Sequence, residues 1–223
     1  MKLNQFRRAA GITSVALALS VSLAACGNED DETASSSDSS SSSSSDMESS
    51  PAAEGAQAQT FGDACSAVPT SGPGSFDGMV KDPVATAASN NPILSTLVTA
   101  VGAAGLGDTL NGAPALTVFA PFNDAFAAIP EADLNALIEG AKKDGAKSDL
   151  AKILTHHVLG ENDDPAAVVG EKDTLAGDKL TIEGDENGMT VSDGTVTANV
   201  LCGNIPTANA TVYVIDKVLT GVK

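Results

Sequence analysis

A stretch of serine and acidic residues divides this chain and limits which part of it can fold. Twelve of the twenty residues from 31 to 50 are serine, and residues 27–62 carry eight acids and no base. Such a segment has almost no apolar side chains to bury, so folding could not recover the entropy lost on ordering it. We therefore expect residues 27–62 to form a flexible tether with an r.m.s. span of about 30–36 Å. Residues 63–223 are long enough to form one folded domain.

The first 26 residues have the pattern of an export signal. Three basic residues precede an apolar run that ends at Ala25. The run is too short and too interrupted for a membrane-spanning helix, which needs about 20 apolar residues, so we expect residues 1–25 to be a signal peptide. The small residues directly before Cys26 resemble the bacterial lipobox, which implies that the Cys26 thiol is acylated and that cleavage occurs before it. The alternative is an ordinary signal peptide followed by a chance cysteine.

The two other cysteines form an even pair if Cys26 carries lipid. Outside the cytoplasm a pair such as Cys65 and Cys202 usually oxidises. The bridge would close a loop of about 137 residues (from 65 to 202), which would stabilise the fold by about 4–5 kcal/mol through loop-closure entropy. The alternative is two buried free thiols. Metal binding is not expected, because no second cysteine or histidine lies near either one in the sequence.

The net charge of −17 excludes one class of function. A nucleic-acid-binding protein needs clustered Lys and Arg side chains, and this chain has no arginine beyond Arg8. Phosphate groups and anionic lipid headgroups would repel the domain. We therefore expect no nucleic-acid partner, and contact with a membrane only through the lipid anchor.

The spacing of apolar residues changes along the domain from a helical to a strand period. Asp82 and Pro83 are typical of an N-cap and a first helical position, and Asn91 and Pro92 repeat this signal. We expect helices from these two points and at residues 122–128, 130–137 and 148–154. We expect strands at residues 116–120, 179–183, 189–191, 196–200 and 211–216, the last continuing through 218–219. Helices first and strands later indicate an α+β domain with a helical layer on a mostly antiparallel sheet.

Two stretches closely resemble the two signatures of the fasciclin domain family. Leu116–Phe126 (LTVFAPFNDAF) resembles the first signature, and Asn209–Leu219 (NATVYVIDKVL) resembles the second. His156-His157-Val158 stands between them, where the family usually has a tyrosine–histidine pair. Over residues 63–223, including the two cysteines, the chain resembles the secreted and surface-lipoprotein mycobacterial members of the family. The resemblance implies a wedge of helices on a small β-sandwich and an adhesion or interaction function.

The chain departs from the family pattern at Phe122, which replaces a threonine, and at His156, which replaces the tyrosine. The tyrosine–histidine region is linked to integrin binding in animal relatives, and we do not carry that role over. His156, His157 and Val158 remain candidate binding residues. Neighbours in a strand point to opposite faces, so the two histidines should not share a metal. We expect His157 to be buried and hydrogen-bonded, and His156 to be exposed.

Motifs of known catalytic families are missing from the sequence. We therefore expect no enzyme activity, no catalytic residues, no metal and no cofactor. The acidic run Glu161–Asp164 lacks the glycine and the spacing of an EF-hand loop, which leaves a solvated loop or a weak calcium site as alternatives. Asn209-Ala210-Thr211 is a formal glycosylation sequon that we expect to form a turn.

Two functions follow from these observations. The first is adhesion or interaction by a monomeric lipoprotein, anchored by palmitate-type acylation at the outer face of the cell membrane or released from it. Its partners would be extracellular proteins or glycans of the matrix, a host or a neighbouring cell, and the tether would extend its reach. The second is an envelope carrier for a small molecule or lipid, in which the apolar helix at residues 93–101 would line a pocket.

Overall fold

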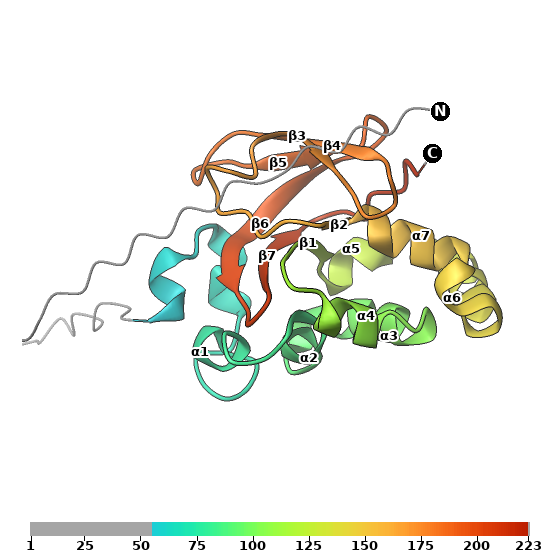
Figure 1. Ribbon diagram of the computed structural model, residues 1–223, viewed down its shortest axis with the longest axis horizontal. Coiled ribbons are helices and arrows are strands. Elements are labelled where there is room, and N and C mark those ends of the chain that lie inside the picture. The colour runs from blue at the N-terminus through green and yellow to red at the C-terminus, as the bar shows by residue number, and fades with distance from the viewer. Residues whose placement is uncertain (1–54, 223) are drawn as a thin grey trace, which may run out of the picture. The chain divides into compact units, whose positions relative to one another are not determined.

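The computed structural model describes residues 55–222 of the 223-residue chain (Figure 1). The predicted signal peptide, the predicted lipidation site Cys26 and the predicted tether as far as residue 54 lie outside the described residues. The helices are η1 (Ala56–Gln59), η2 (Asp63–Ala67), α1 (Phe76–Met79), α2 (Val84–Ser89), η3 (Pro92–Leu94), α3 (Ser95–Ala103), α4 (Gly107–Gly112), α5 (Asn123–Ala127), α6 (Glu131–Asp144), η4 (Gly145–Lys147) and α7 (Asp149–His156). The strands are β1 (Leu116–Pro121), β2 (Val158–Leu159), β3 (Gly170–Asp173), β4 (Lys179–Glu183), β5 (Thr190–Ser192), β6 (Thr197–Pro206) and β7 (Ala210–Ile215).

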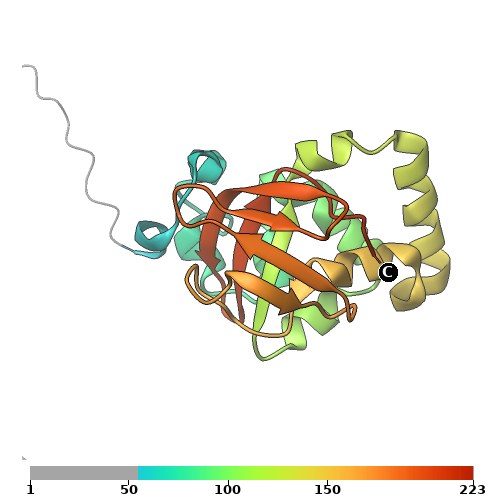
Figure 2. The same ribbon diagram turned by 90° about the horizontal axis from the view of Figure 1, so that it is seen from above.

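The seven strands form one sheet in the order β2-β1-β7-β6-β5-β4-β3. Only β1 and β7 pair in parallel, and the other neighbours are antiparallel. The long strand β6 pairs with β5 through its first residues and with β7 through the rest, and its register shifts near Cys202. Such irregularities bend a strand and increase its twist. The sheet therefore folds over, so that β3, β4 and β5 lie above β1, β2 and β7, with the helices below (Figure 1). Seen from above, the strands of the upper part cover the central strands (Figure 2).

Two apolar cores hold these layers together. The larger core lies between the helices and the β1–β7 part of the sheet, where Leu97, Phe126 and Val212 are buried. The smaller core lies inside the folded sheet, where the rings of Phe119 and Tyr213 are 5.7 Å apart. Every residue of β1 and β7 is buried, because these central strands are covered on both faces. The prediction of an α+β domain with a helical layer on a mostly antiparallel sheet is confirmed.

Asparagines from distant segments hold the starts of two helices. The Val84 backbone N–H donates to Asn209 Oδ1 at 2.9 Å, and the Ala85 N–H donates to Asn111 Oδ1 at 3.0 Å. The Thr96 N–H of α3 donates in the same way to Asn123 Oδ1 at 3.0 Å. Such bonds satisfy N–H groups that have no partner inside the helix. The prediction of Asp82 as an N-cap is wrong, because Pro83 occupies the N-cap position of α2.

Other predicted starts agree better with the structure. The Asn91 side chain accepts from the Ile93 N–H, and the Ser148 hydroxyl accepts from the Ala151 N–H at the start of α7. Helix α6 is longer than predicted and continues to Asp144. Residues 218–219 do not continue the last strand, although both side chains are buried.

Residues 55–62 correct the predicted end of the tether. The Phe61 backbone pairs with Gly203 of β6, and the Phe61 ring lies 6.3 Å from the ring of Tyr213. Gly203 has no side chain, and a Cβ atom built there would overlap the Phe61 ring. The folded domain therefore begins before residue 63. The sequence did not reveal this, because the partners of Phe61 lie about 140 residues further along the chain.

Candidate functional site

His157 is buried and hydrogen-bonded, as predicted. Each of its two ring nitrogens has a partner. It caps the C-terminus of α7, where its Nδ1 lies 2.7 Å from the Ile153 carbonyl oxygen. The Leu219 backbone N–H donates to Nε2 at 2.9 Å. Nδ1 must therefore carry the proton and donate it, and the ring is neutral. Burial is the main cause that lowers the pKa of His157 to about 4.

His156 is buried, which corrects the prediction that it is exposed. Its side chain is 1% exposed. Its Nδ1 lies 3.3 Å from Asp178 Oδ2, and its Nε2 lies 3.7 Å from Asp193 Oδ2. The two histidines lie at the end of a helix and not in a strand, and their rings meet edge to face with centroids 6.2 Å apart. They face different partners, so they do not form a joint metal site.

Asp193 connects the His156 environment to the C-terminal segment. Burial alone would raise its pKa, but the backbone N–H groups of Val196, Gly221 and Thr195 donate to the carboxylate and outweigh this effect, so the pKa is lowered. The Gly221 N–H bond is 2.7 Å long. Together with the bond from Leu219 to His157, this contact fastens the last residues to the body of the domain. His157 and Asp193 therefore serve the fold, whereas His156 is buried beside two carboxylates and neither of its ring nitrogens makes a hydrogen bond within the described residues.

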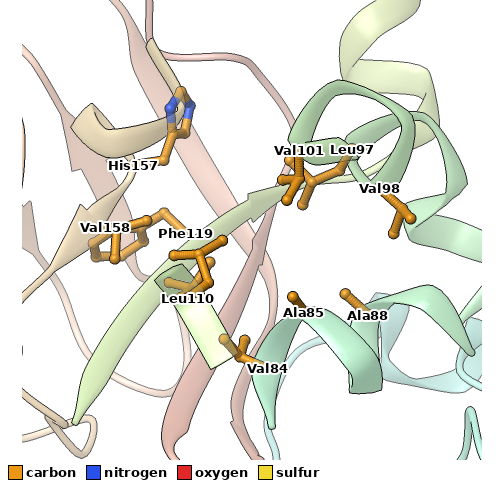
Figure 3. A pocket seen from close by; sticks show the side chains of 11 residues that line it. Val84, Ala85, Ala88, Leu97, Val98, Val101, Leu110, Phe119, His157 and Val158 are labelled. Carbon is orange, nitrogen blue, oxygen red and sulfur yellow. The ribbon is translucent and has the colours of Figure 1, made fainter. Parts of the chain in front are cut away.

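Val158, the third candidate binding residue, is also buried and lines a small apolar cavity (Figure 3). The side chains around the cavity come from α2, α3, α4 and the β1–β2 edge and are almost entirely apolar. They are Val84, Ala85, Ala88, Leu97, Val98, Val101, Leu110, Val118, Phe119, His157 and Val158. The cavity volume is about 50 Å³, whereas an engineered cavity that binds benzene has about 150 Å³.

Cys65 and Cys202 form the predicted disulfide. The bond joins η2, near the start of the described chain, to the middle of β6, and spans a sequence separation of 137 residues. Cys202 is fully buried, and Cys65 packs against the larger core. The disulfide therefore fixes the first helical turns to the central part of the sheet.

The acidic run Glu161–Asp164 is a bonded loop. The Asp163 carboxylate pairs with Lys172 Nζ at 2.9 Å. The Asp163 backbone donates to the Thr117 hydroxyl and accepts from the Tyr213 hydroxyl. Because a lysine already neutralises the most buried carboxylate of the run, this geometry favours a loop that serves the fold over a calcium site.

Asn209 of the formal sequon has all its side-chain atoms in use. Its Oδ1 accepts from Val84, and its Nδ2 donates to the carbonyl oxygens of Leu110 and Ala113, each at 2.9 Å. The side chain thereby joins α2, the end of α4 and the start of β7. Asn209 lies in the bend before β7, as predicted, whereas Ala210 and Thr211 already belong to β7. The amide nitrogen of Asn209 is held inside the fold.

A second cavity, which the sequence did not suggest, lies between α6 and α7. It is a cleft of about 440 Å³ with aspartates and small or apolar side chains around it. The residues of α6 that line the cleft are spaced by three, four and seven positions, so they share one face of the helix. The sequence shows this spacing, but an exposed helix face without a binding site has the same spacing.

Within residues 55–222, no group of three His, Cys, Asp or Glu side chains is placed to hold a metal ion, and no helix has the length and hydropathy of a membrane span.

The described residues form an α+β domain in which a helical layer covers a sheet that folds over itself. His157 and Tyr213 make hydrogen bonds inside this fold. Comparison with known proteins identifies its family. The model of the Fasciclin domain matches residues 92–221, which is more than half of the chain, so this chain belongs to the fasciclin domain family. The family resemblance of the two signature stretches is thereby confirmed.

The chain is also similar to individual family members. Cell surface glycolipoprotein MPB83 from Mycobacterium bovis is 46% identical over 153 residues, which cover 66% of this chain and 64% of that protein. Immunogenic protein MPB70 from the same species is 42% identical over 179 residues, which cover 77% of this chain and 86% of that protein. The chain thus spans somewhat less than two thirds of the glycolipoprotein and most of the immunogenic protein.

A solved structure shows the same fold. The FAS1 domain pair from the insect cell adhesion molecule Fasciclin I matches 66% of this chain and 54% of its own chain, with a TM-score of 0.54 and 16% sequence identity. At this identity the likeness concerns the fold alone. It confirms the expected arrangement of helices on a folded sheet.

Proposed function

We propose that this chain is a lipoprotein of the outer cell surface whose fasciclin domain binds extracellular partners and catalyses no reaction. The observation that carries the proposal is the 46% identity to a protein named a cell surface glycolipoprotein. A FAS1 domain pair of the same fold comes from a cell adhesion molecule. The partners would be proteins or glycans of a matrix, a host or a neighbouring cell.

The geometry supports a surface-binding module in a second way. Both histidines are buried, and the hydroxyl of Tyr213 donates to a backbone carbonyl inside the fold. Burial also raises the pKa of Tyr213 above its ordinary value, so the phenol keeps its proton. These groups are therefore occupied by the fold, and recognition falls to the outer surface.

The anchor is tested by metabolic labelling with a palmitate analogue. Wild-type chain should carry the label and should sediment with membranes, and a Cys26→Ala variant should do neither. An unlabelled chain, or a mature protein that still begins upstream of Cys26, would contradict the anchor. Binding is tested separately by adding the purified chain to immobilised matrix proteins and to whole cells, where saturable binding is expected.

A second function, a carrier of small apolar molecules, is supported by the apolar cavity between α2, α3 and the β1–β2 edge (Figure 3). Residues Leu97, Val98 and Val101 of α3 line it, as the carrier hypothesis expected. Its volume of about 50 Å³ restricts an occupant to a few heavy atoms unless the helices move apart. Native mass spectrometry of the purified chain distinguishes the two functions, because a carrier should retain a ligand of defined mass.

A further inference from the structure

The cleft between α6 and α7 has an apolar floor and an acidic rim. Leu137 of α6 and Leu150 of α7 contribute to the floor, and Leu150 is buried. Asp133, Asp144 and Asp149 stand around it and are exposed. No lysine or arginine is among the residues that line the cleft, but Lys152 Nζ pairs with Asp149 Oδ1 at 3.4 Å. The volume of about 440 Å³ lies in the range of about 300–1,000 Å³ that is usual for ligand sites.

Two residues of α6 that line the cleft reduce the stability of their own helix. Gly140 lies in the interior of a 14-residue helix, where glycine costs roughly 1 kcal/mol relative to alanine. No atom lies within 4 Å of a Cβ atom built at this position, so packing does not require the glycine. Asp144 ends the helix, where the helix dipole disfavours a negative charge. Natural proteins break such local rules mainly at functional sites.

Gly140 and Asp144 would affect a ligand in two different ways. The missing side chain of Gly140 leaves the cleft open and lets a ligand approach the helix backbone closely. Asp144 adds a carboxylate to the rim that Asp133 provides from the first turn of the same helix. Residues 133, 137, 140 and 144 recur at intervals of three and four, so they share one face of α6.

Charge complementarity selects the occupant. Because Lys152 already pairs with Asp149, the carboxylates of Asp133 and Asp144 are the ones that attract a cation. The apolar floor suits an aliphatic chain, and Lys and Arg side chains combine both features. A second copy of this chain is disfavoured, because the net charge is −17. The chain's own tether is disfavoured too, because residues 27–62 carry eight acids and no base.

We infer that the cleft between α6 and α7 binds a basic, partly aliphatic peptide segment of another protein. Lys or Arg side chains of this segment lie along Leu137 and Leu150. One charged end meets the carboxylate of Asp133 and another meets that of Asp144, about three turns further along α6. This assignment rests on the proposed function, since it names the chemistry of the partner and the face that binds it.

The test uses the whole purified chain and a short fluorescent peptide of alternating Lys and Leu, followed by fluorescence anisotropy. Gly140→Leu fills the cleft without changing the charge and should weaken binding about tenfold or more. Asp133→Asn with Asp144→Asn keeps the shape and should weaken binding about threefold to tenfold, since each exposed charge pair contributes little. Gly102→Leu is the control, because Gly102 is another helical glycine with open space around a Cβ atom built there, and it lies outside the cleft. Asp108→Asn with Asp124→Asn is the charge control, because it removes two exposed carboxylates outside the cleft.

The two control variants should bind like wild type, and peptides with Glu for Lys or Ser for Leu should bind at least tenfold more weakly. Thermal melting of Gly140→Leu should show an unchanged or higher midpoint, since leucine favours a helix. Binding that is absent, or equally strong in the two cleft variants and their controls, overturns the assignment. If the wild-type chain still binds matrix proteins or cells in a parallel assay, the proposed function stands and only this cleft is excluded.

Discussion

Replacement of His157 by glutamine should remove a pH-dependent part of the stability of this domain. In the structure the neutral ring donates from Nδ1 to the Ile153 carbonyl and accepts at Nε2 from the Leu219 N–H. A second proton would have to enter at Nε2, where it would face another N–H group. His156 and Asp193 are the neighbouring titratable groups, but burial is the main reason for the lowered pKa.

The size of the effect follows from the pKa in the two states. The pKa is about 4 in the folded chain, against 6.5 for an unperturbed histidine. The unfolded chain therefore binds a proton first as the pH falls, so stability is full above pH 6.5 and decreases towards pH 4. The complete loss would be about 3 kcal/mol. Between pH 7.5 and pH 5, before most carboxylates titrate, it would be about 2 kcal/mol.

Urea denaturation at pH 7.5 and at pH 5 measures this loss. Wild type should lose about 2 kcal/mol of unfolding free energy between the two values. The glutamine variant should be less stable at pH 7.5, because it loses buried hydrogen bonds, but should lack that additional loss at pH 5. Contributions from other groups are present in both proteins and cancel in the comparison. Equal pH dependence of the two proteins would refute the assigned protonation of His157.

Three further predictions concern contacts that join distant segments. Cys65→Ser, or reduction of wild type, should lower the unfolding free energy by about 4–5 kcal/mol, measured by calorimetry with and without reductant; an unchanged melting curve would show that the bridge does not form. Asn209→Ala should cost about 2–4 kcal/mol, since it removes three partly buried hydrogen bonds, and Asn209→Asp should cost at least as much, because its second carboxylate oxygen would face the Leu110 and Ala113 carbonyl oxygens. Gly203→Ala should cost about 1–3 kcal/mol by displacing the Phe61 ring; a cost that persists in a Phe61→Ala background would contradict this reason.

Local sequence patterns correctly predicted elements whose structure depends on residues close by in the sequence. Strand β4 was predicted at Lys179–Glu183 from its alternation, and its residues are alternately exposed and buried. Ser148 was predicted as an N-cap because its partner lies only three residues away. In both cases the physical cause lies within a few residues of the element.

The errors arose where the cause lies far away in the sequence. The start of α2 is bonded to Asn209, 125 residues further along the chain, so the sequence around Asp82 could not reveal it. His156 is buried because turns that carry Asp178 and Asp193 close over the end of α7. The candidate cleft was missed for another reason. The predicted helix ended at residue 137, whereas α6 continues to Asp144, so the turns that carry Gly140 and Asp144 were not predicted as helix.

The position of the disulfide determines how the domain responds to mechanical load. A pull that enters from the N-terminal side meets the Phe61–Gly203 bridge and then the covalent bond between Cys65 and Cys202. This bond transfers the tension to β6, which pairs with β7 at Cys202 and with β5 through its first residues. Strands on both sides of β6 then share the force, so the first helices cannot be peeled away one after another. Reduction of this single bond would remove that protection and leave only the weaker contacts around Phe61.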